Sequence, residues 1–356
     1  MTKVMYISGT YAPSFGGAEI SIHTLLKNIS RKKEFEVEVL TNVQHPKANL
    51  EYEGIPIKGV NHENRGRDIV DRIILFKPDV IITQLIWSDI VLEICNRLSI
   101  PSILRIGSVP FNLDISKKSS YAPSEIIVPS DFVRDYVRDT WERESVVIPP
   151  QINVNRVLAN KDPSENRYIT LFNPLVKKGG QIFYNIAKSM PEYNFCVVKG
   201  WDMLKDRDGN FDDSKIEQIC ESLRIPYNGQ RPKTVNNFPL NVKVIEPIDD
   251  VNQIYAQTRI LCVPSICQET FSRTTMEGFA NKIPVIGSNV GGLAKNVREG
   301  GIIVYDYTNP DEWIKTVKML DESSKYSEYS EKGFDYFKRE QNSDEITMKF
   351  ERVLKS

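Results

Sequence analysis

The chain of 356 residues is too long for one ordinary domain and long enough for two. Its composition, 40% hydrophobic and 26% charged, is typical of a globular protein and excludes a disordered one. The formal net charge of −1 provides no overall basic field, so nucleic acid is not an expected partner. The basic run at 31–33 is typical of a solvated helix end, and a weak contact with anionic lipid is the less favoured alternative.

The N-terminal stretch MTKVMYISG predicts a short strand, not a signal peptide. No apolar run approaches the roughly 18 residues that a membrane span needs. The five cysteines lie in apolar segments without C-x-x-C spacing, which is typical of reduced core cysteines. We therefore expect a cytoplasmic protein, and peripheral attachment at the inner face of a membrane stays open.

Short β-branched runs alternate with longer helical patterns along the chain. In the first half the predicted strands are 4–8, 35–41, 79–83, 102–106, 125–129 and 145–149. In the second half they are 168–172, 194–198, 242–246, 259–264, 284–288 and 301–305. Because these runs are apolar on both faces and separated by helices, they indicate an α/β protein with parallel, doubly wound sheets.

A stretch rich in proline and polar residues at 149–167 is predicted to link two domains. We place the first domain at 1–155 and the second at 156–337. A C-terminal helix at 338–356 is expected to pack back on the first. Ligands of doubly wound sheets bind outside the carboxyl ends of the strands, where we look for the site.

The segment CQETFSRTTMEG (267–278) contains two glutamates, Glu269 and Glu277, in one strand-to-helix connection. Ser272 is a plausible N-cap, so the backbone N–H groups of 270–273 would point out of the helix start and favour an anion. One glutamate then precedes the anion site and the other follows it. Neither is well placed to share a proton with the other.

Two further elements follow strands of the same half. Gly291 and Gly292 come after the strand at 284–288 and would allow a backbone to approach a phosphate closely. Lys177 and Lys178 stand at a strand-to-helix turn, where a lysine provides a point charge. Taken singly, each is explained by an ordinary turn or a solvated surface. Together, at the carboxyl ends of strands in one domain, they favour a shared anionic ligand.

The succession NPLVKKGG (173–180), VPSICQETFSRTTMEG (263–278) and IPVIGSNVGGL (283–293) resembles the retaining GT-B glycosyltransferases, specifically family four, the glycosyl transferases group 1. YAPSFGGAE (11–19) resembles the N-terminal glycine loop of that family. The resemblance implies two Rossmann-like domains facing each other across a cleft. The first would bind the acceptor and the second the nucleotide-sugar donor.

The resemblance also implies roles for individual residues. Glu269 would contact hydroxyls of the donor sugar, Lys178 would neutralise the diphosphate leaving group, and Glu277 would bind the ribose. The first two are the expected catalytic residues. The other residues expected at the donor are Gly16, Gly17, Asn173, Lys177, Thr270, Phe271, Ser272, Arg273, Gly291 and Gly292.

The chain also departs from the pattern of this family. Asn173 stands where an arginine is usual, and Lys177 or Arg273 can take over part of that charge; a surface salt bridge is the alternative for Arg273. Gly107, expected at the acceptor side of the cleft, stands where a histidine near the sugar is common in the family. Arg105 nearby is expected either to face the acceptor side of the cleft or to form a buried structural ion pair.

We therefore predict a retaining, metal-independent glycosyltransferase that moves a sugar from a nucleotide-diphosphate sugar to a hydroxyl of a glycan, a lipid-linked precursor or a small molecule. No cofactor is expected besides this co-substrate. The acidic loop at 206–217 lacks the glycine that a calcium loop needs, so no metal is assigned. The alternatives are a nucleotide-sugar epimerase on the same fold and a non-catalytic nucleotide-sugar-binding protein.

Overall fold

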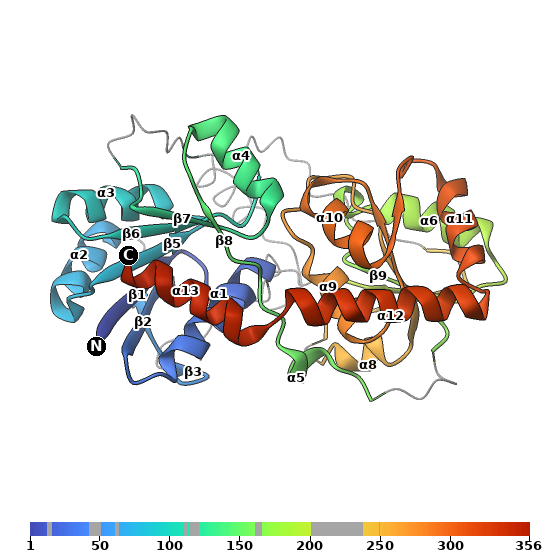
Figure 1. Cartoon of the computed structure of the whole chain (residues 1–356), viewed down its shortest axis with the longest axis horizontal. Coiled ribbons are helices and arrows are strands. Elements are labelled where there is room, and N and C mark those ends of the chain that lie inside the picture. The colour runs from blue at the N-terminus through green and yellow to red at the C-terminus, as the bar shows by residue number, and fades with distance from the viewer. Residues whose placement is uncertain are drawn as a thin grey trace. The chain divides into compact units, whose positions relative to one another are not determined.

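The computed structural model describes residues 1–12, 16–42, 51–60, 64–109, 113, 121–160, 166–200, 238–248 and 250–356. The chain divides into two compact units, each with its own sheet and helices (Figure 1). The described part of unit 1 is Met1–Gln151 with Ser343–Ser356, and that of unit 2 lies between Ile152 and Asn342.

Within its described residues, unit 1 forms an eight-stranded sheet in the order β3-β4-β2-β1-β5-β6-β7-β8. All neighbouring strands are parallel except the pair β3–β4. The strands are β1 (Thr2–Ser8), β2 (Phe35–Asn42), β3 (Glu51–Tyr52), β4 (Ile55–Val60), β5 (Val80–Gln84), β6 (Ser102–Arg105), β7 (Glu125–Val128) and β8 (Val146–Val147). The helices are α1 (Gly17–Ser30), α2 (Arg65–Phe76), α3 (Ser88–Leu98), α4 (Asp131–Trp141) and α13 (Ser343–Lys355).

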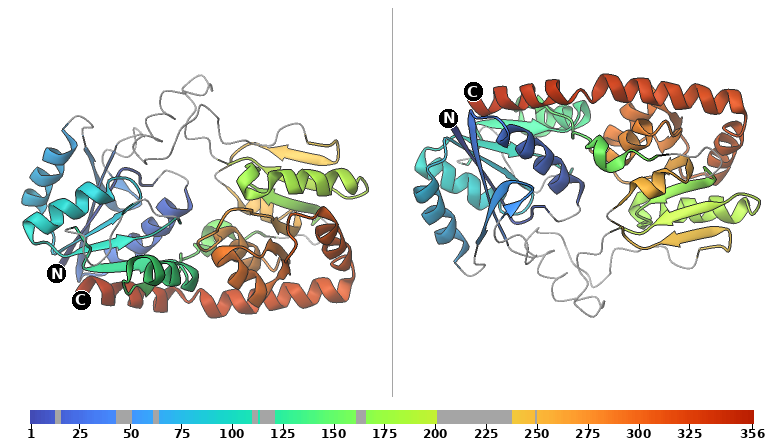
Figure 2. Two further views of the ribbon diagram at one scale, coloured as in Figure 1. Left: turned by 90° about the horizontal axis from the view of Figure 1, so that it is seen from above. Right: turned by 90° about the horizontal axis from the view of Figure 1, so that it is seen from below.

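Both faces of this sheet are buried, because successive side chains of a strand point to opposite sides. Val4 and Tyr6 of β1 join the apolar cluster beneath α1 and α13, whereas Met5 and Ile7 join the cluster beneath α2 and α3. The C-terminal helix α13 thus completes the core of unit 1 beside α1 (Figure 2).

Unit 2 contains a parallel sheet with six described strands in the order β11-β10-β9-β12-β13-β14. The strands are β9 (Tyr168–Phe172), β10 (Phe195–Val198), β11 (Val242–Ile245), β12 (Thr258–Val263), β13 (Val285–Ser288) and β14 (Ile302–Val304). The helices are α5 (Val154–Val157), the short 3-10 helix η3 (Val176–Lys178), α6 (Gly180–Ser189), α8 (Asn252–Tyr255), α9 (Arg273–Ala280), α10 (Gly291–Gly300), α11 (Pro310–Met319) and α12 (Ser323–Glu340).

The second sheet is buried on both faces in the same way. In β12, Ile260 and Cys262 pack with α6 and α11, and Leu261 and Val263 pack with α9, α10 and α12. A central strand with apolar residues on both sides therefore needs helices on both sides, as its continuous apolar sequence predicts.

The prediction of two parallel, helix-covered sheets is confirmed, and every predicted strand is present within one or two residues of its expected ends. The strands β3 and β4 were not predicted. Pro56 and Gly59 interrupt the β-branched pattern of β4, and only Ile55, Ile57 and Val60 in it are buried. Pairing with β2, and not local propensity, makes this segment a strand.

Where the chain passes from one unit to the other, hydrogen bonds are formed within each unit. The Gln151 amide donates to the backbone oxygen of Ser343 at 3.2 Å, and the Ile152 N–H donates to Gln341 Oε1 at 2.9 Å. Ile152 and Val157, which lie in the stretch expected to be a linker, are buried in the apolar cluster of unit 2. Part of that stretch is therefore packed, despite its polar composition.

Helix packing in unit 2 depends on two glycines that face one aromatic ring. A Cβ on Gly333 of α12 would lie 2.4 Å from Cδ1 of Phe279, and a Cβ on Gly300 of α10 would lie 2.8 Å from the same ring. Phe279 itself is fully buried. Because the two glycines have no side chains, α10 and α12 can pack closely against Phe279 of α9.

We predict that Gly333→Ala lowers the free energy of unfolding by about 1–3 kcal/mol, because overpacking against Phe279 outweighs the better helix propensity of alanine. The matched control is Gly66→Ala in α2, where the new Cβ meets only Ile90 Cδ1 at an ordinary 3.6 Å. Urea unfolding measures both. Equal stability of the two variants would contradict the proposed packing role of Gly333.

Candidate functional site

The direction of strand connection reverses between β9 and β12 in unit 2, and the carboxyl ends of these two strands are where a doubly wound sheet binds its ligand. The segment that follows β9 and the segment that follows β12 lie directly against each other. The N–H groups of Ile266 and Cys267 both donate to the carbonyl oxygen of Lys177, at 3.0 and 3.2 Å. Two residues far apart in sequence, Lys178 and Glu269, are thereby brought to one place.

The turn at Gly179 makes this approach possible. Its φ is +81°, a left-handed conformation that glycine adopts without strain. A Cβ there would lie 1.9 Å from the carbonyl oxygen of Pro264. Any other residue would push the lysine-bearing turn away from the segment after β12.

Lys178 and Glu269 form an ion pair. Lys178 Nζ donates to Glu269 Oε1 at 2.6 Å, and Ser265 Oγ donates to the same oxygen at 2.6 Å. The two charged side chains are 31% and 13% exposed. The partners within the described chain bind Oε1, which leaves Oε2 as the carboxylate oxygen for a ligand.

Helix α9 begins where predicted, but the Ser272 side chain does not cap it as expected. Ser272 occupies the N-cap of α9 with φ +68°, and its Oγ lies 2.9 Å from Thr275 Oγ1 without bonding a backbone N–H. The first turn of α9 therefore has no side-chain cap from Ser272. Uncapped N–H groups and the positive end of the helix dipole favour an anion at this end.

Glu277, one turn further along α9, is held by two other groups. Tyr255 Oη donates to Oε2 at 2.7 Å, and Arg273 Nη2 donates to Oε1 at 3.2 Å. Burial, together with the Glu277 charge, raises the pKa of Tyr255 well above its ordinary value, so this phenol stays a donor. Glu269 and Glu277 have separate partners, which agrees with two distinct roles and not with a shared proton.

Arg273 is less exposed than a surface salt bridge requires. Its side chain is 14% exposed, and its Nη1 is buried without a hydrogen-bond partner in the described parts of the chain. The ion pair with Glu277 satisfies one side of the guanidinium only. Nη1, on the other side, is enclosed by the protein.

The third element, Gly291–Gly292, meets the same segment from β13. The Gly292 N–H donates to the Glu269 carbonyl oxygen at 2.6 Å, and a Cβ on Gly291 would lie 2.4 Å from that oxygen. Asn296 of α10 donates to the carbonyl oxygen of Phe271 at 2.6 Å. The two glycines thus allow the start of α10 to contact the backbone of Glu269. The Gly292 N–H makes its hydrogen bond in this contact.

The other residues of unit 2 that we expected at the nucleotide-sugar donor lie beside Lys178, beside Glu269 or at the end of β9. Lys177 is exposed beside Lys178, and Asn173 has φ +62° at the end of β9. The Asn173 side chain lies against Gly200, where a Cβ would be 3.0 Å from its amide carbon. Thr270 is half-buried next to Glu269.

In unit 1, Gly16 is the N-cap of α1 and Gly17 its first residue. A Cβ on Gly16 would lie 2.0 Å from Glu19 Oε2, so the carboxylate sits directly against the glycine backbone. Gly107 packs against Ala18, where its Cβ would lie 3.3 Å from that of the alanine. Both glycines therefore have close neighbours around the start of α1.

Arg105 is in the interior of unit 1. It is 2% exposed and donates to Gln84 Oε1 at 2.7 Å and to Ser21 Oγ at 2.6 Å. Arg105 is thus buried, as the structural alternative requires, but these two bonds go to neutral groups and not to a carboxylate.

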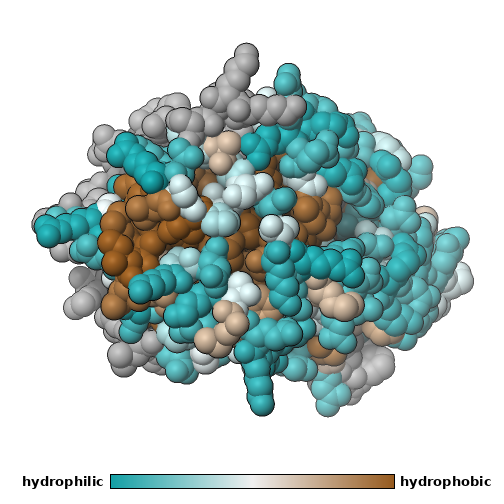
Figure 3. Space-filling view, turned by 60° about the vertical axis from the view of Figure 1, so that its left-hand side comes forward, coloured by the Kyte–Doolittle hydropathy of each residue, from teal (hydrophilic) through white to brown (hydrophobic). Residues whose placement is uncertain are grey.

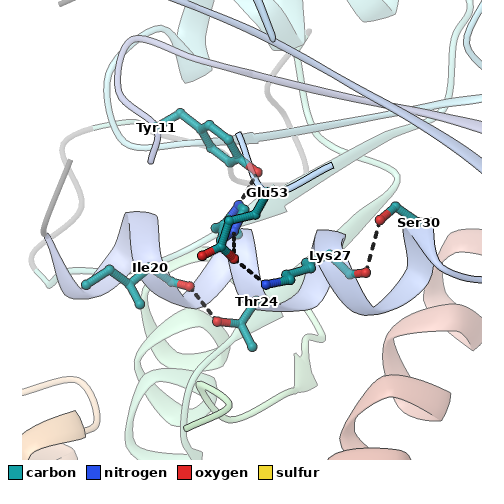
Figure 4. Close-up of polar contacts among 7 residues, drawn as sticks. Tyr11, Ile20, Thr24, Lys27, Ser30 and Glu53 are labelled. Carbon is teal, nitrogen blue, oxygen red and sulfur yellow. Dashed lines mark hydrogen bonds and ion pairs between the residues drawn. The ribbon is translucent and has the colours of Figure 1, made fainter. Parts of the chain in front are cut away.

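A polar cluster around His23 was not predicted from the sequence (Figure 4). The Tyr11 hydroxyl lies 2.8 Å from His23 Nδ1, Glu53 Oε2 lies 3.1 Å from His23 Nε2, and Lys27 pairs with the same carboxylate oxygen. Tyr11 and His23 are buried. The cluster ties the loop after β1 to α1 and to the turn between β3 and β4. Only a prediction of that hairpin could have placed Glu53 here.

The described residues contain neither a metal-binding cluster nor a membrane-spanning helix. No group of three or more histidine, cysteine, aspartate or glutamate side chains there could hold a metal ion. The acidic loop at 206–217 lies outside the described residues. None of the helices in the described ranges combines the length and the apolarity required to cross a lipid bilayer.

Comparison with solved structures identifies the architecture. Over 100% of this chain and 100% of the other, the structure is similar to Anabaena HepE in complex with UDP-glucose, with a TM-score of 0.77 and 15% identity. Sucrose-phosphate synthase from Thermosynechococcus elongatus gives a TM-score of 0.76 and 14% identity over 100% of this chain and 98% of the other. The chain has the GT-B fold.

Sequence comparisons agree with a GT-B glycosyltransferase. Residues 222–322 match the family model of the glycosyl transferases group 1. The chain is 25% identical to an uncharacterised glycosyltransferase of Methanocaldococcus jannaschii over 92% of each chain. A spore coat protein of Bacillus subtilis, protein SA, is 30% identical over 24% of this chain and 23% of the other. Together these matches support a glycosyltransferase.

The His23 cluster generates a prediction about stability and pH. Burial opposes ionisation of Glu53, but the bonds from Lys27 and His23 outweigh it and hold the pKa of Glu53 below its ordinary value. A lowered pKa in the folded state contributes stability above the unfolded-state pKa, and this contribution is lost as the pH falls through the lowered value.

We therefore expect Glu53→Gln to reduce the free energy of unfolding at pH 7 by less than about 1 kcal/mol, since the carboxylate is partly exposed. The difference from the wild type should disappear in acid. Glu51→Gln, at an exposed position of β3, is the control and should have no effect. A Glu53→Gln deficit that persists unchanged in acid would show that charge is not the cause.

Proposed function

We propose that the protein is a retaining glycosyltransferase that transfers a sugar from a nucleotide-diphosphate sugar to a hydroxyl of a glycan, a lipid-linked precursor or a small molecule. The observation that carries this proposal is the pairing of Lys178 with Glu269 at the strand ends where β9 and β12 adjoin, beside the uncapped start of α9. HepE, whose structure was solved with UDP-glucose, has a similar fold, which makes UDP-glucose the first donor to test.

In this proposal the diphosphate binds between Lys178 and the first turn of α9. When the bond between the sugar and the diphosphate breaks, negative charge develops on the leaving group and must be stabilised. The ammonium group and the oriented N–H groups supply that stabilisation without a divalent ion. Lys178 exchanges part of its interaction with Glu269 for one with the phosphate.

Glu269 would then hold the sugar. With Oε1 bound to Lys178 and Ser265, Oε2 is the oxygen that accepts from sugar hydroxyls. The acceptor hydroxyl attacks on the face from which the diphosphate leaves, so the anomeric configuration is retained. This stereochemistry comes from the family resemblance, and NMR of the product anomer tests it.

Glu277 would bind the ribose. Tyr255 and Arg273 each donate one bond to the carboxylate, and each carboxylate oxygen keeps lone-pair capacity for a ribose hydroxyl. The positive charge of Arg273 would supply part of the charge that Asn173 does not provide.

We predict that Lys178→Met and Glu269→Gln each lower the rate of transfer at least about 100-fold, because each removes a group that acts on the transition state. The control is Lys199→Met, which removes a lysine from another ion pair of unit 2, the exposed pair with Glu246 at 2.5 Å. Nucleotide release with a panel of nucleotide sugars and acceptors measures all three variants. Full activity of either site variant would refute its role.

We predict that Glu277→Gln weakens UDP binding about 10-fold to 100-fold, because the loss of a charged hydrogen-bond acceptor costs about 1.5–3 kcal/mol. Tyr255→Phe should weaken it less, since the carboxylate stays in place without one of its donors. Titration calorimetry with UDP measures the affinities, and Glu299→Gln on α10 is the exposed control. Unchanged affinity in Glu277→Gln would remove this residue from the nucleotide site.

The same assays separate this function from its alternatives. An epimerase would convert the nucleotide sugar without any acceptor, and a binding protein would bind UDP and the donor without transfer. Acceptor-dependent release of the nucleotide supports the glycosyltransferase alone.

A further inference from the structure

Figure 3 shows apolar side chains at the surface of the molecule between polar ones. In unit 1, Ile74 and Leu75 are 61% and 70% exposed, and nothing in the structure shows what covers them. Unit 2 contains the opposite case, polar side chains that the protein encloses next to the candidate site. Asn296 of α10 and Tyr336 of α12 are only 5% and 3% exposed. Because burial of a polar group is costly unless it forms hydrogen bonds, the partners of these two side chains are informative.

Asn296 and Tyr336 form a short series of hydrogen bonds that ends at the segment after β12. Asn296 Nδ2 donates to the carbonyl oxygen of Phe271 at 2.6 Å, and the Tyr336 hydroxyl donates to Asn296 Oδ1 at 3.0 Å. A carbonyl oxygen can only accept, so the Asn296 amide must turn its nitrogen towards Phe271 and its oxygen towards Tyr336. The orientation of the Asn296 side chain is therefore determined from both ends.

The Tyr336 ring is itself fixed by packing. It meets the ring of Phe279 edge-on, with the ring centroids 6.1 Å apart, and the guanidinium carbon of Arg339 lies 5.1 Å from its centroid. Helices α10 and α12 both pack against α9, as Figure 1 shows. The hydroxyl that orients Asn296 thus comes from the packed interior of unit 2.

The bond from Asn296 sets the direction of one peptide group. In a trans peptide the N–H points opposite to the C=O, so the Ser272 N–H points away from Asn296 and α10. This N–H makes no hydrogen bond to the backbone of the residues that the structure describes. Ser272 is the N-cap of α9, so its N–H lies beside those of the first helical turn, where the proposed function places the diphosphate.

The backbone of Ser272 would relax without this bond. Its φ of +68° lies in the left-handed region, which a residue with a side chain seldom adopts. Rotation of the peptide between Phe271 and Ser272 by half a turn would give a negative φ. The Phe271 carbonyl oxygen, in place of the N–H, would then point away from α10 and repel a phosphate. The Asn296 bond therefore opposes a change that the local preference of serine favours.

We propose that Asn296 is a positioning residue for the diphosphate of the nucleotide-sugar donor, and that Tyr336 orients it. Asn296 acts through the backbone, because it holds the Phe271 carbonyl and so keeps the Ser272 N–H directed at the phosphate. The inference rests on the proposed function and adds to it the group that maintains the anion-binding backbone. Both side chains are buried and act only through this peptide. Their contribution therefore concerns the phosphates of the ligand and not its nucleoside.

Asn296→Leu keeps the approximate shape of the side chain but cannot donate. We expect it to weaken UDP binding about 10-fold to 100-fold and uridine binding less than about 2-fold, because only UDP carries phosphates. Tyr336→Phe should change UDP binding in the same direction by a smaller factor, since Asn296 keeps its donor and loses one constraint. Titration calorimetry with UDP and with uridine on the full chain gives the ratio of the two affinities.

The matched control is Asn241→Leu, which removes another side-chain amide that holds backbone carbonyls in unit 2. Asn241 Nδ2 donates to the carbonyl oxygens of Ala187 and Met190 at 3.0 Å and to that of Tyr193 at 3.1 Å. These groups lie at the amino ends of β10 and β11, at the opposite end of the strands from the candidate site. The control should lower the stability of the protein and leave the ratio of the UDP and uridine affinities unchanged.

The ratio of affinities separates positioning from a purely structural role, which would weaken both ligands alike or neither. Either of these results for Asn296→Leu overturns the inference and leaves the proposed function standing, provided that the wild type transfers sugar. A crystal structure of Asn296→Leu in which Ser272 keeps a positive φ also overturns it. If Asn296→Leu does not fold, Tyr336→Phe decides, and an unchanged ratio refutes the positioning role. A wild type that binds no nucleoside diphosphate overturns both the inference and the proposed function.

Discussion

The carbonyl and carboxylate groups of one residue, Glu269, hold together the three segments of the candidate site. Its side chain pairs with Lys178 from the turn after β9, and its carbonyl oxygen accepts the Gly292 N–H from the turn after β13. The segment that carries it is fixed in turn by the bonds from Ile266 and Cys267 to Lys177. The geometry of the site therefore depends on backbone contacts between strand ends, and the charged side chains are positioned by them.

Glycines make these contacts possible, and this fact explains why the sequence is informative here. Gly179 and Gly291 both have positive φ, and at both a Cβ would overlap a carbonyl oxygen of the segment after β12. A pattern of glycines after strands is visible in the sequence. The sequence cannot show whether such glycines approach a ligand or another part of the backbone. In this structure Gly292 gives its N–H to the chain itself.

The fold could be predicted well because its strands carry a strong local signal. Central strands such as β1 and β12 are apolar on both faces, and their ends follow from the same pattern. The hairpin of β3 and β4 has no such signal, since it depends on pairing with β2. The cluster around His23 was missed for the same reason: Glu53 reaches the histidine only through that hairpin.

Within the site, the positions of Lys178, Glu269 and Glu277 could be predicted, but their partners could not. Ser265 and Tyr255 carry no motif, and they act on the two glutamates through single hydroxyl groups. The conformation of Ser272 was also not predictable. A serine at φ +68° is uncommon, and no feature of the sequence signals it.

The two units differ in the polar groups at the strand ends where the order of connection reverses. In unit 1 the order of connection reverses between β1 and β5. The polar groups there bind one another: Ser8 donates to the Gln84 backbone, and Thr10 donates to Glu19. Arg105 is almost wholly buried among them. In unit 2 the corresponding strand ends carry Lys178 and Glu269, which keep part of their surface exposed.

A charged pair that stays partly exposed costs less to separate than one buried in the interior, because water compensates each charge as the other leaves. In our proposal Lys178 therefore exchanges its carboxylate for a phosphate with little penalty, whereas Arg105 could not leave Gln84 and Ser21 without losing buried hydrogen bonds. This difference in cost is one reason why we propose unit 2, and not unit 1, for the anion-binding chemistry. In unit 1, the start of α1 has the Glu19 carboxylate directly against Gly16.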